Sequence, residues 1–104
     1  MRRNGIYSFL YRNGQDGSFC VKIGRSKDID RRLRQHRQTN PSITVGPTIE
    51  LPLDRCTVDL EHWIHRMMRE WFDSPYKEHY RLPTEDWIEF MEGGFFQEVS
   101  ESIS

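Results

Sequence analysis

The sequence has only two cysteines and no long apolar run, and both shortages exclude whole classes of protein. Cys20 and Cys56 lie far apart with no Cys-x-x-Cys spacing, which excludes a disulfide framework or a cysteine-based zinc site. We therefore expect two buried thiols. No stretch approaches the roughly 18 apolar residues that span a bilayer, and the first four residues lead into a strand pattern instead of a signal-peptide core. We expect a cytoplasmic protein without a membrane partner.

Hydrophobic residues are also scarce, at 36% of the chain against 30% charged residues. Three Trp, four Tyr and six Phe nevertheless supply bulky side chains for a core, so the chain is folded and not disordered. A length of 104 residues fits one domain with a modest core. We expect residues 1–92 to form this single domain and residues 93–104 to be a frayed C-terminal tail.

The net charge of −1 hides a strong asymmetry along the chain. Residues 1–37 contain ten Lys or Arg against three Asp, a balance of +7, whereas residues 38–104 contain five against thirteen acidic residues, a balance of −8. A basic cluster of this kind attracts phosphate backbones whatever the overall charge. A solvated helix face of mixed charge is an equally good explanation from charge alone, because Asp28 and Asp30 lie within the cluster.

The first half of the chain has the pattern of a β-hairpin followed by a helix. Aromatic and branched residues predict strands over residues 6–11 and 19–23, and the loop between them carries Asn-Gly and Asp-Gly turn signals. Ser26 is predicted to cap a helix that begins near Lys27 and ends near Gln38.

The second half predicts an interrupted strand and two helices. Residues 43–51 form the interrupted strand, with Gly46-Pro47 at the break, and residues 80–82 a short extended piece. A last helix starts at Thr84 and is stopped by Gly93-Gly94. The strongest helix covers residues 54–72, and its predicted buried stripe consists of Leu60, Trp63, Ile64, Met67 and Trp71.

Five short motifs follow one another on these elements: Gly5-Ile6-Tyr7, Lys22-Ile23-Gly24, Arg32, Glu61 and Glu78-His79-Tyr80. This ordered set resembles the GIY-YIG endonuclease superfamily, most closely its small phage-type branch, in which the second motif often reads Lys-Ile-Gly. The resemblance covers about residues 5–82. It implies an α+β fold with a small three-stranded antiparallel sheet flanked by helices, and cleavage of DNA with one divalent metal.

The resemblance also implies a role for four catalytic residues, and phosphodiester hydrolysis has a use for each. Glu61 would hold the single metal, Mg²⁺ or Mn²⁺, because a hard carboxylate is a typical ligand for such ions. Arg32 would stabilise the phosphate in the transition state with its two-pronged guanidinium, and Tyr7 would orient or activate the attacking water. Lys22 stands where the better-studied branch has a second tyrosine, and it would bind phosphate or assist Tyr7 by its charge.

Further residues are expected to contact the substrate, and ordinary structural roles stay open beside the functional ones. Glu61 suits a solvated helix surface, Tyr7 a core position, and Arg32 an ion pair with Asp28. The Glu61-His62-x-x-His65 sequence lacks the spacing of a zinc protease motif. The expected substrate contacts are Arg25, Lys27, Arg31, Arg34, His36 and His65.

DNA is the expected partner, but the sequence contains no zinc finger or helix-turn-helix signature. Specificity would then come from dimerisation, from a separate targeting protein, or from a preferred DNA structure. The alternative is a catalytically silent domain of the same fold that binds nucleic acid or protein, since fold does not determine function. A purely structural small protein is a third hypothesis.

Overall fold

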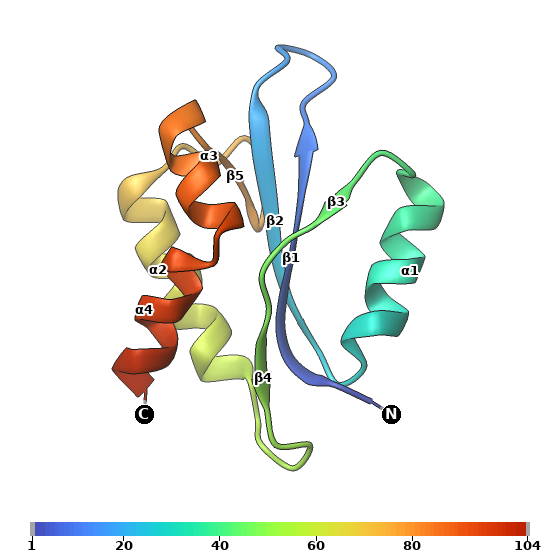
Figure 1. The fold of residues 1–104 in the computed structure, drawn as a ribbon, viewed down its shortest axis with the longest axis vertical. Coiled ribbons are helices and arrows are strands. Elements are labelled where there is room, and N and C mark those ends of the chain that lie inside the picture. The colour runs from blue at the N-terminus through green and yellow to red at the C-terminus, as the bar shows by residue number, and fades with distance from the viewer. Residues whose placement is uncertain (1, 104) are drawn as a thin grey trace.

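The computed structural model describes residues 2–103, and it has one antiparallel sheet with helices on both faces (Figure 1). The central strand β1 (Asn4–Arg12) pairs with β2 (Phe19–Ser26), and the register places Tyr7 opposite Gly24. The loop between these strands is longer than a two-residue turn, as the sequence predicts. This hairpin is the frame on which the remaining elements assemble.

Three shorter strands complete the sheet, in the order β3-β1-β2-β5 with β4 also paired to β1. The interrupted third strand is confirmed as β3 (Thr44–Val45) and β4 (Ile49–Leu51), which pair with successive parts of β1. On the other side, β5 (His79–Arg81) pairs with β2. The expected α+β fold is confirmed, and β5 extends the expected three-stranded sheet at the edge of β2.

The helices divide the core into two layers, one on each face of the sheet (Figure 1). On one face lies α1 (Ile29–Thr39), with Ile29 and Leu33 packed against Tyr7 and Phe9. The other face carries α2 (Val58–Trp71), α3 (Thr84–Met91) and α4 (Gly94–Ile103). Alternating side chains of β1 enter the two layers in turn, as the period of a strand requires.

Two helix starts differ from the sequence prediction. In α1 the N-cap is Asp28, not Ser26, and its carboxylate accepts a hydrogen bond from the backbone N–H of Arg31. Ser26 instead accepts a hydrogen bond from the N–H of Asp28, so the two residues form successive turns into the helix. The second long helix begins at Val58 and not at Asp54, because residues 52–55 form a turn closed by Arg55 and the Pro52 carbonyl.

The predicted buried stripe of α2 is wrong by part of a turn. Trp71 is 58% exposed and Trp63 is also exposed, whereas the buried residues are Glu61, Ile64, His65 and Met68. These four follow the i, i+3, i+4, i+7 spacing of one helix face. The helix can bury this mixed face because polar partners from the sheet meet its two polar residues.

The prediction of a frayed C-terminal tail is wrong for α4. Phe95, Phe96 and Val99 of this helix are buried and belong to the same core cluster as β1 and α2, so the folded unit continues past residue 92. Cys56 also differs from expectation, since it is exposed and only Cys20 is buried. None of the helices in residues 2–103 has the length and apolar character to cross a membrane.

Gly5, the first residue of the first motif, has a structural role that can be tested. Its φ of 153° is disfavoured for other residues, and a Cβ there would lie 1.8 Å from the backbone oxygen of Ile49. We expect Gly5→Ala to break the pairing of β1 with β4 and to lower the free energy of unfolding by about 2–4 kcal/mol. Urea denaturation measures this change.

The matched control is Gly14→Ala, because a Cβ at Gly14 meets no atom within 4 Å. This variant should stay within about 0.5 kcal/mol of the wild type. Equal stability of the two variants would contradict the structural role of Gly5.

Candidate functional site

The candidate site lies at the point along β2 where its pairing with the edge strand β5 ends. β5 pairs only with Cys20, Val21 and Lys22, and the last contact is the N–H of Ile23 donating to the carbonyl of Glu78. From Gly24 onward, β2 has no strand on this side in the described part of the chain. Side chains from both faces of the sheet come together around this open edge.

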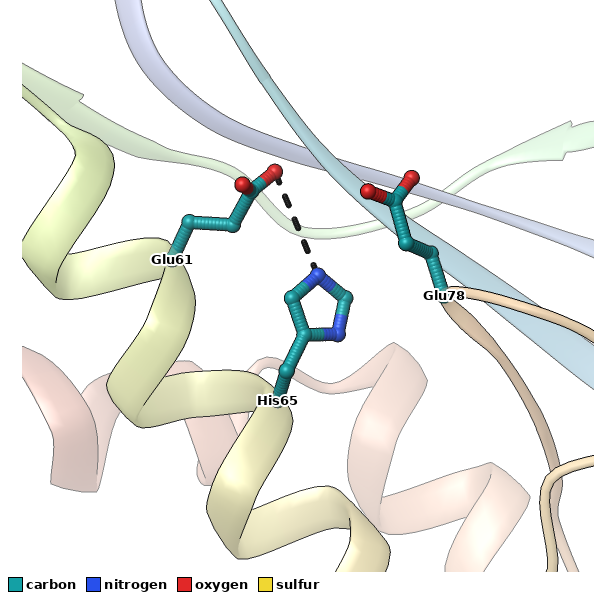
Figure 2. Close-up of side chains that lie close together, drawn as sticks. All are labelled: Glu61, His65 and Glu78. Atoms are coloured by element: carbon teal, nitrogen blue, oxygen red, sulfur yellow. Dashed lines mark ion pairs between the residues drawn. The ribbon is translucent and has the colours of Figure 1, made fainter.

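Three metal-ligating side chains converge on the α2 side of this edge. Figure 2 shows Glu61 and His65 projecting from α2 toward Glu78, which precedes β5. One ligand atom from each residue lies within 4.8 Å of the other two. Glu61 is 9% exposed and His65 is 5% exposed, so two of the three groups are buried. Buried polar groups of this kind need partners or a function.

His65 has a partner for one ring nitrogen and none for the other. Its Nδ1 forms a 2.6 Å hydrogen bond with the hydroxyl of Tyr80, whose ring stacks on the imidazole. Its Nε2 is buried without a hydrogen-bond partner and lies 3.9 Å from the nearest oxygen of Glu61, beyond hydrogen-bond range. Burial lowers the pKa of His65, so the imidazole is held neutral and suited to ligate a cation.

The two carboxylates differ in their electrostatic surroundings. Burial raises the pKa of Glu61, and the nearby charge of Glu78 adds to the shift. The guanidinium of Arg25 opposes it from 3.5 Å. Burial also pushes the pKa of Glu78 upward, but the hydrogen bond and charge of Lys22 outweigh this and lower it. The cluster therefore attracts positive charge.

Glu78 reaches the cluster through an unusual backbone conformation. Its φ is 60°, in the left-handed region that residues other than glycine seldom adopt. The residue turns the chain into β5, and its side chain forms an ion pair with Lys22. Glu78 belongs to a sequence motif but is not among the predicted site residues. In the sequence Glu78 lies three residues before Arg81, and this position does not indicate that its side chain lies close to α2.

On the opposite face of the sheet, Tyr7 forms a hydrogen bond with His36. The phenolic oxygen lies 2.9 Å from Nε2 of His36, which also contacts the ring of Phe9. A Cβ on Gly24 would lie 2.5 Å from the phenolic oxygen of Tyr7. The glycine of the second motif therefore makes room for the phenol of the first.

His36 is placed as a partner of Tyr7, and not simply on the outer surface of α1. Burial lowers its pKa, and the charges of Arg32 and Lys22 lower it further. A neutral imidazole nitrogen can accept a hydrogen bond from a phenol, so the pair has the arrangement that proton transfer requires. The spacing of three residues from buried Leu33 is the sequence signal that places His36 beside the core.

Lys22 connects the two faces of the sheet. Its ammonium lies 6.0 Å from the centre of the Tyr7 ring and pairs with Glu78. Its charge also acts on Glu61, His65 and His36. Of the predicted catalytic residues, Lys22 is thus the one that reaches both groups of side chains.

Arg32 and the predicted basic contacts lie on the surface around α1. The side chain of Arg32 donates to Gln35 at 3.1 Å and does not form the ion pair with Asp28. Lys27, Arg31 and Arg34 are exposed, and a shallow hollow is lined by Lys27, Arg31 and Arg32. Arg25 differs from these residues because it turns toward Glu61. The structure therefore separates a basic outer surface from the half-buried acidic cluster.

Comparison with known proteins identifies a family for this chain. The T5orf172 domain family matches the chain over residues 5–94. No curated protein and no solved structure matches it significantly. The matched range includes Tyr7, Lys22, His36, Glu61 and Glu78.

The contact between Gly24 and Tyr7 leads to a prediction. We expect Gly24→Ala to displace the phenol and to break its hydrogen bond with His36, at a cost of about 1–3 kcal/mol in stability. NMR of the imidazole ring should show loss of the nuclear Overhauser contact between Tyr7 and His36. Tyr7→Phe, which removes only the hydroxyl, is the reference for the lost hydrogen bond. An unchanged contact in Gly24→Ala would contradict the prediction.

Proposed function

Because the chain belongs to the T5orf172 domain family, we propose that it is a metal-dependent endonuclease that hydrolyses DNA phosphodiester bonds. The family has a GIY-YIG-like fold of the homing-endonuclease type and suggests a nuclease-like or DNA-binding role. The finer assignment to the small phage-type branch of the GIY-YIG superfamily is part of the proposal. It is supported by the arrangement of Tyr7, Lys22 and Glu61 around one edge of the sheet.

The burial of Glu61 is the observation that carries the proposal. A carboxylate that is 9% exposed, with its nearest cation at 3.5 Å, is not explained by stability, because desolvation disfavours its charged form. Functional sites retain such groups. The residues present fit a cation, since the buried Nε2 of His65 has no other partner and lies beside Glu61.

Glu61 would hold one divalent metal, Mg²⁺ or Mn²⁺. When bound, such an ion neutralises charge on the phosphate and makes a bound water more acidic. Lys22 would bind a phosphate oxygen from the same edge of the sheet. Arg32 lies near His36 with a neutral hydrogen-bond partner, Gln35, and its guanidinium can rotate toward a phosphate.

Tyr7 and His36 would act together on the attacking water. In this proposal the Tyr7 hydroxyl would donate to Nε2 of a neutral His36, 2.9 Å away, and the phenolic oxygen could accept a hydrogen bond from water. Proton transfer from the water to Tyr7, and from Tyr7 to His36, would generate hydroxide without leaving a charged phenol. His36 is therefore proposed as a positioning and proton-accepting group, and not merely as a substrate contact.

DNA would approach over the basic outer surface of α1. Lys27, Arg31 and Arg34 are exposed there and can contact the phosphate backbone. This surface also favours the alternative function, a catalytically silent nucleic-acid-binding or protein-interaction domain. A homodimer or a separate targeting protein remains the proposed source of sequence specificity.

The proposed role of Glu61 can be tested by substitution. Purified protein should cut supercoiled or branched DNA in Mg²⁺ or Mn²⁺, and Glu61→Gln should lower the cleavage rate by about 10²-fold or more while DNA binding is kept. Gel assays of cleavage and of DNA binding measure the two effects. Glu70→Gln, an exposed glutamate on the same helix, should cleave like the wild type. If the wild type and both variants bind DNA but none of them cleaves it in the presence of metal, the result would support the alternative of a catalytically silent DNA-binding domain.

A second prediction separates the roles of Tyr7 and His36. Tyr7→Phe should lower kcat by about 10²–10⁴-fold with little change in DNA affinity, because the variant keeps the ring but cannot relay a proton. His36→Gln should also lower kcat, and its activity should depend on pH differently from that of the wild type. Single-turnover cleavage from pH 5.5 to 9 measures both. Identical pH profiles for His36→Gln and the wild type would exclude His36 from proton transfer.

A further inference from the structure

The acidic cluster has a nitrogen donor as well as oxygen donors. Glu61, His65 and Glu78 point into one small space (Figure 2), and their ligand atoms lie within 4.8 Å of one another. Ligands that share one ion at about 2.1 Å are separated by roughly 3–4.2 Å. Small side-chain rotations would therefore bring the three donors onto a common ion.

The Nε2 of His65 is the observation that makes this cluster more than a group of acidic side chains. The His65 side chain is more than nine-tenths buried, and Nε2 has no hydrogen-bond partner. Figure 2 shows the nitrogen aimed into the space between Glu61 and Glu78. A buried polar atom without a partner costs free energy, and a bound cation would remove that cost.

We propose that Glu61, His65 and Glu78 together form a three-ligand metal site that binds Mn²⁺ in preference to Mg²⁺. The two carboxylates supply oxygens, and Nε2 of His65 supplies a nitrogen. Imidazole is a ligand of first-row transition metals, whereas Mg²⁺ prefers oxygen and keeps most of its waters. This inference rests on the proposed function for the role of Glu61 and adds two ligands and a metal preference to it.

Tyr80 completes the site as an outer partner of the imidazole. Its hydroxyl lies 2.6 Å from Nδ1 of His65 and 3.5 Å from the backbone oxygen of the same residue. When the hydroxyl donates to that oxygen, it accepts from Nδ1–H, and Nε2 is left with its lone pair free. A hydrogen bond to the second nitrogen is the usual way in which proteins orient a metal-ligating histidine.

Lys22 would compete with the metal ion for the carboxylate of Glu78. Its ammonium pairs with Glu78 and acts electrostatically on Glu61. If Glu78 ligated a cation, its ion pair with Lys22 would be lost. The Lys22 ammonium would then be available to bind a phosphate of the substrate.

Isothermal titration of the full chain with MnCl₂ and with MgCl₂, without DNA, tests the proposal. The wild type should bind one Mn²⁺ at least about 10-fold more tightly than Mg²⁺, and His65→Gln should lose about 10–100-fold in Mn²⁺ affinity. His62→Gln is the matched control, because His62 is an exposed histidine on the same helix. It should bind both ions like the wild type.

Lys22→Met gives the opposite expectation. Removal of the competing ammonium should tighten Mn²⁺ binding several-fold and should weaken DNA cleavage. Equal Mn²⁺ affinity in Lys22→Met and the wild type would contradict the competition between Lys22 and the ion for Glu78.

A measurement on the wild-type protein tests the proposal even if His65→Gln does not fold. Pulsed EPR of the Mn²⁺-loaded wild type should show coupling to a directly bound ¹⁴N nucleus. Absence of that coupling, or equal affinity for Mn²⁺ and Mg²⁺, would overturn the proposal. If Mn²⁺ is coordinated by nitrogen but the protein cuts no DNA, the metal site is supported and the nuclease function is rejected. If the protein cuts DNA with Mg²⁺ but shows no nitrogen coordination, the nuclease function is supported and the three-ligand site is rejected.

Discussion

The candidate site depends on the burial of two polar side chains on the inner face of α2. Glu61 and His65 share this face with Ile64 and Met68, and all four are removed from solvent. Burial of the apolar pair stabilises the fold by the hydrophobic effect. Burial of the polar pair destabilises the fold unless other polar or charged groups interact with the two side chains. The surrounding elements supply these partners: Arg25 from β2 beside Glu61 and Tyr80 from β5 beside His65.

The late start of β5 explains why these partners are available at an edge and not inside a continuous sheet. The strand begins at His79, opposite Lys22, and Glu78 turns the chain just before it with a φ of 60°. A longer β5 would cover Gly24 and Arg25 with backbone and would separate the two faces. The left-handed backbone of Glu78 lies at this open edge, and such backbone conformations are common at functional sites.

Most elements of this fold follow from local sequence patterns, but α4 and the contacts within the site do not. The turn signals after Arg12 and the break at Gly46-Pro47 specify strands whose partners are near in sequence or forced by the hairpin. The buried face of α2 was mispredicted because Trp63 and Trp71 are more apolar than Glu61 and His65. The contacts of this polar face with Arg25 and Tyr80 join residues far apart in the sequence, so the periodicity of the helix does not show them. The same holds for Glu78, whose contact with Lys22 joins residues 56 positions apart.

Lys22 shows how one residue can belong to both halves of the site. A tyrosine at this position would offer a hydroxyl to the Tyr7 side but no positive charge to the acidic cluster. The ammonium instead offsets part of the repulsion between Glu61 and Glu78 while the cluster holds no cation. Its charge also disfavours protonation of His36 on the other face. In the proposed mechanism, a bound metal ion would take over from the lysine the neutralisation of these two carboxylates.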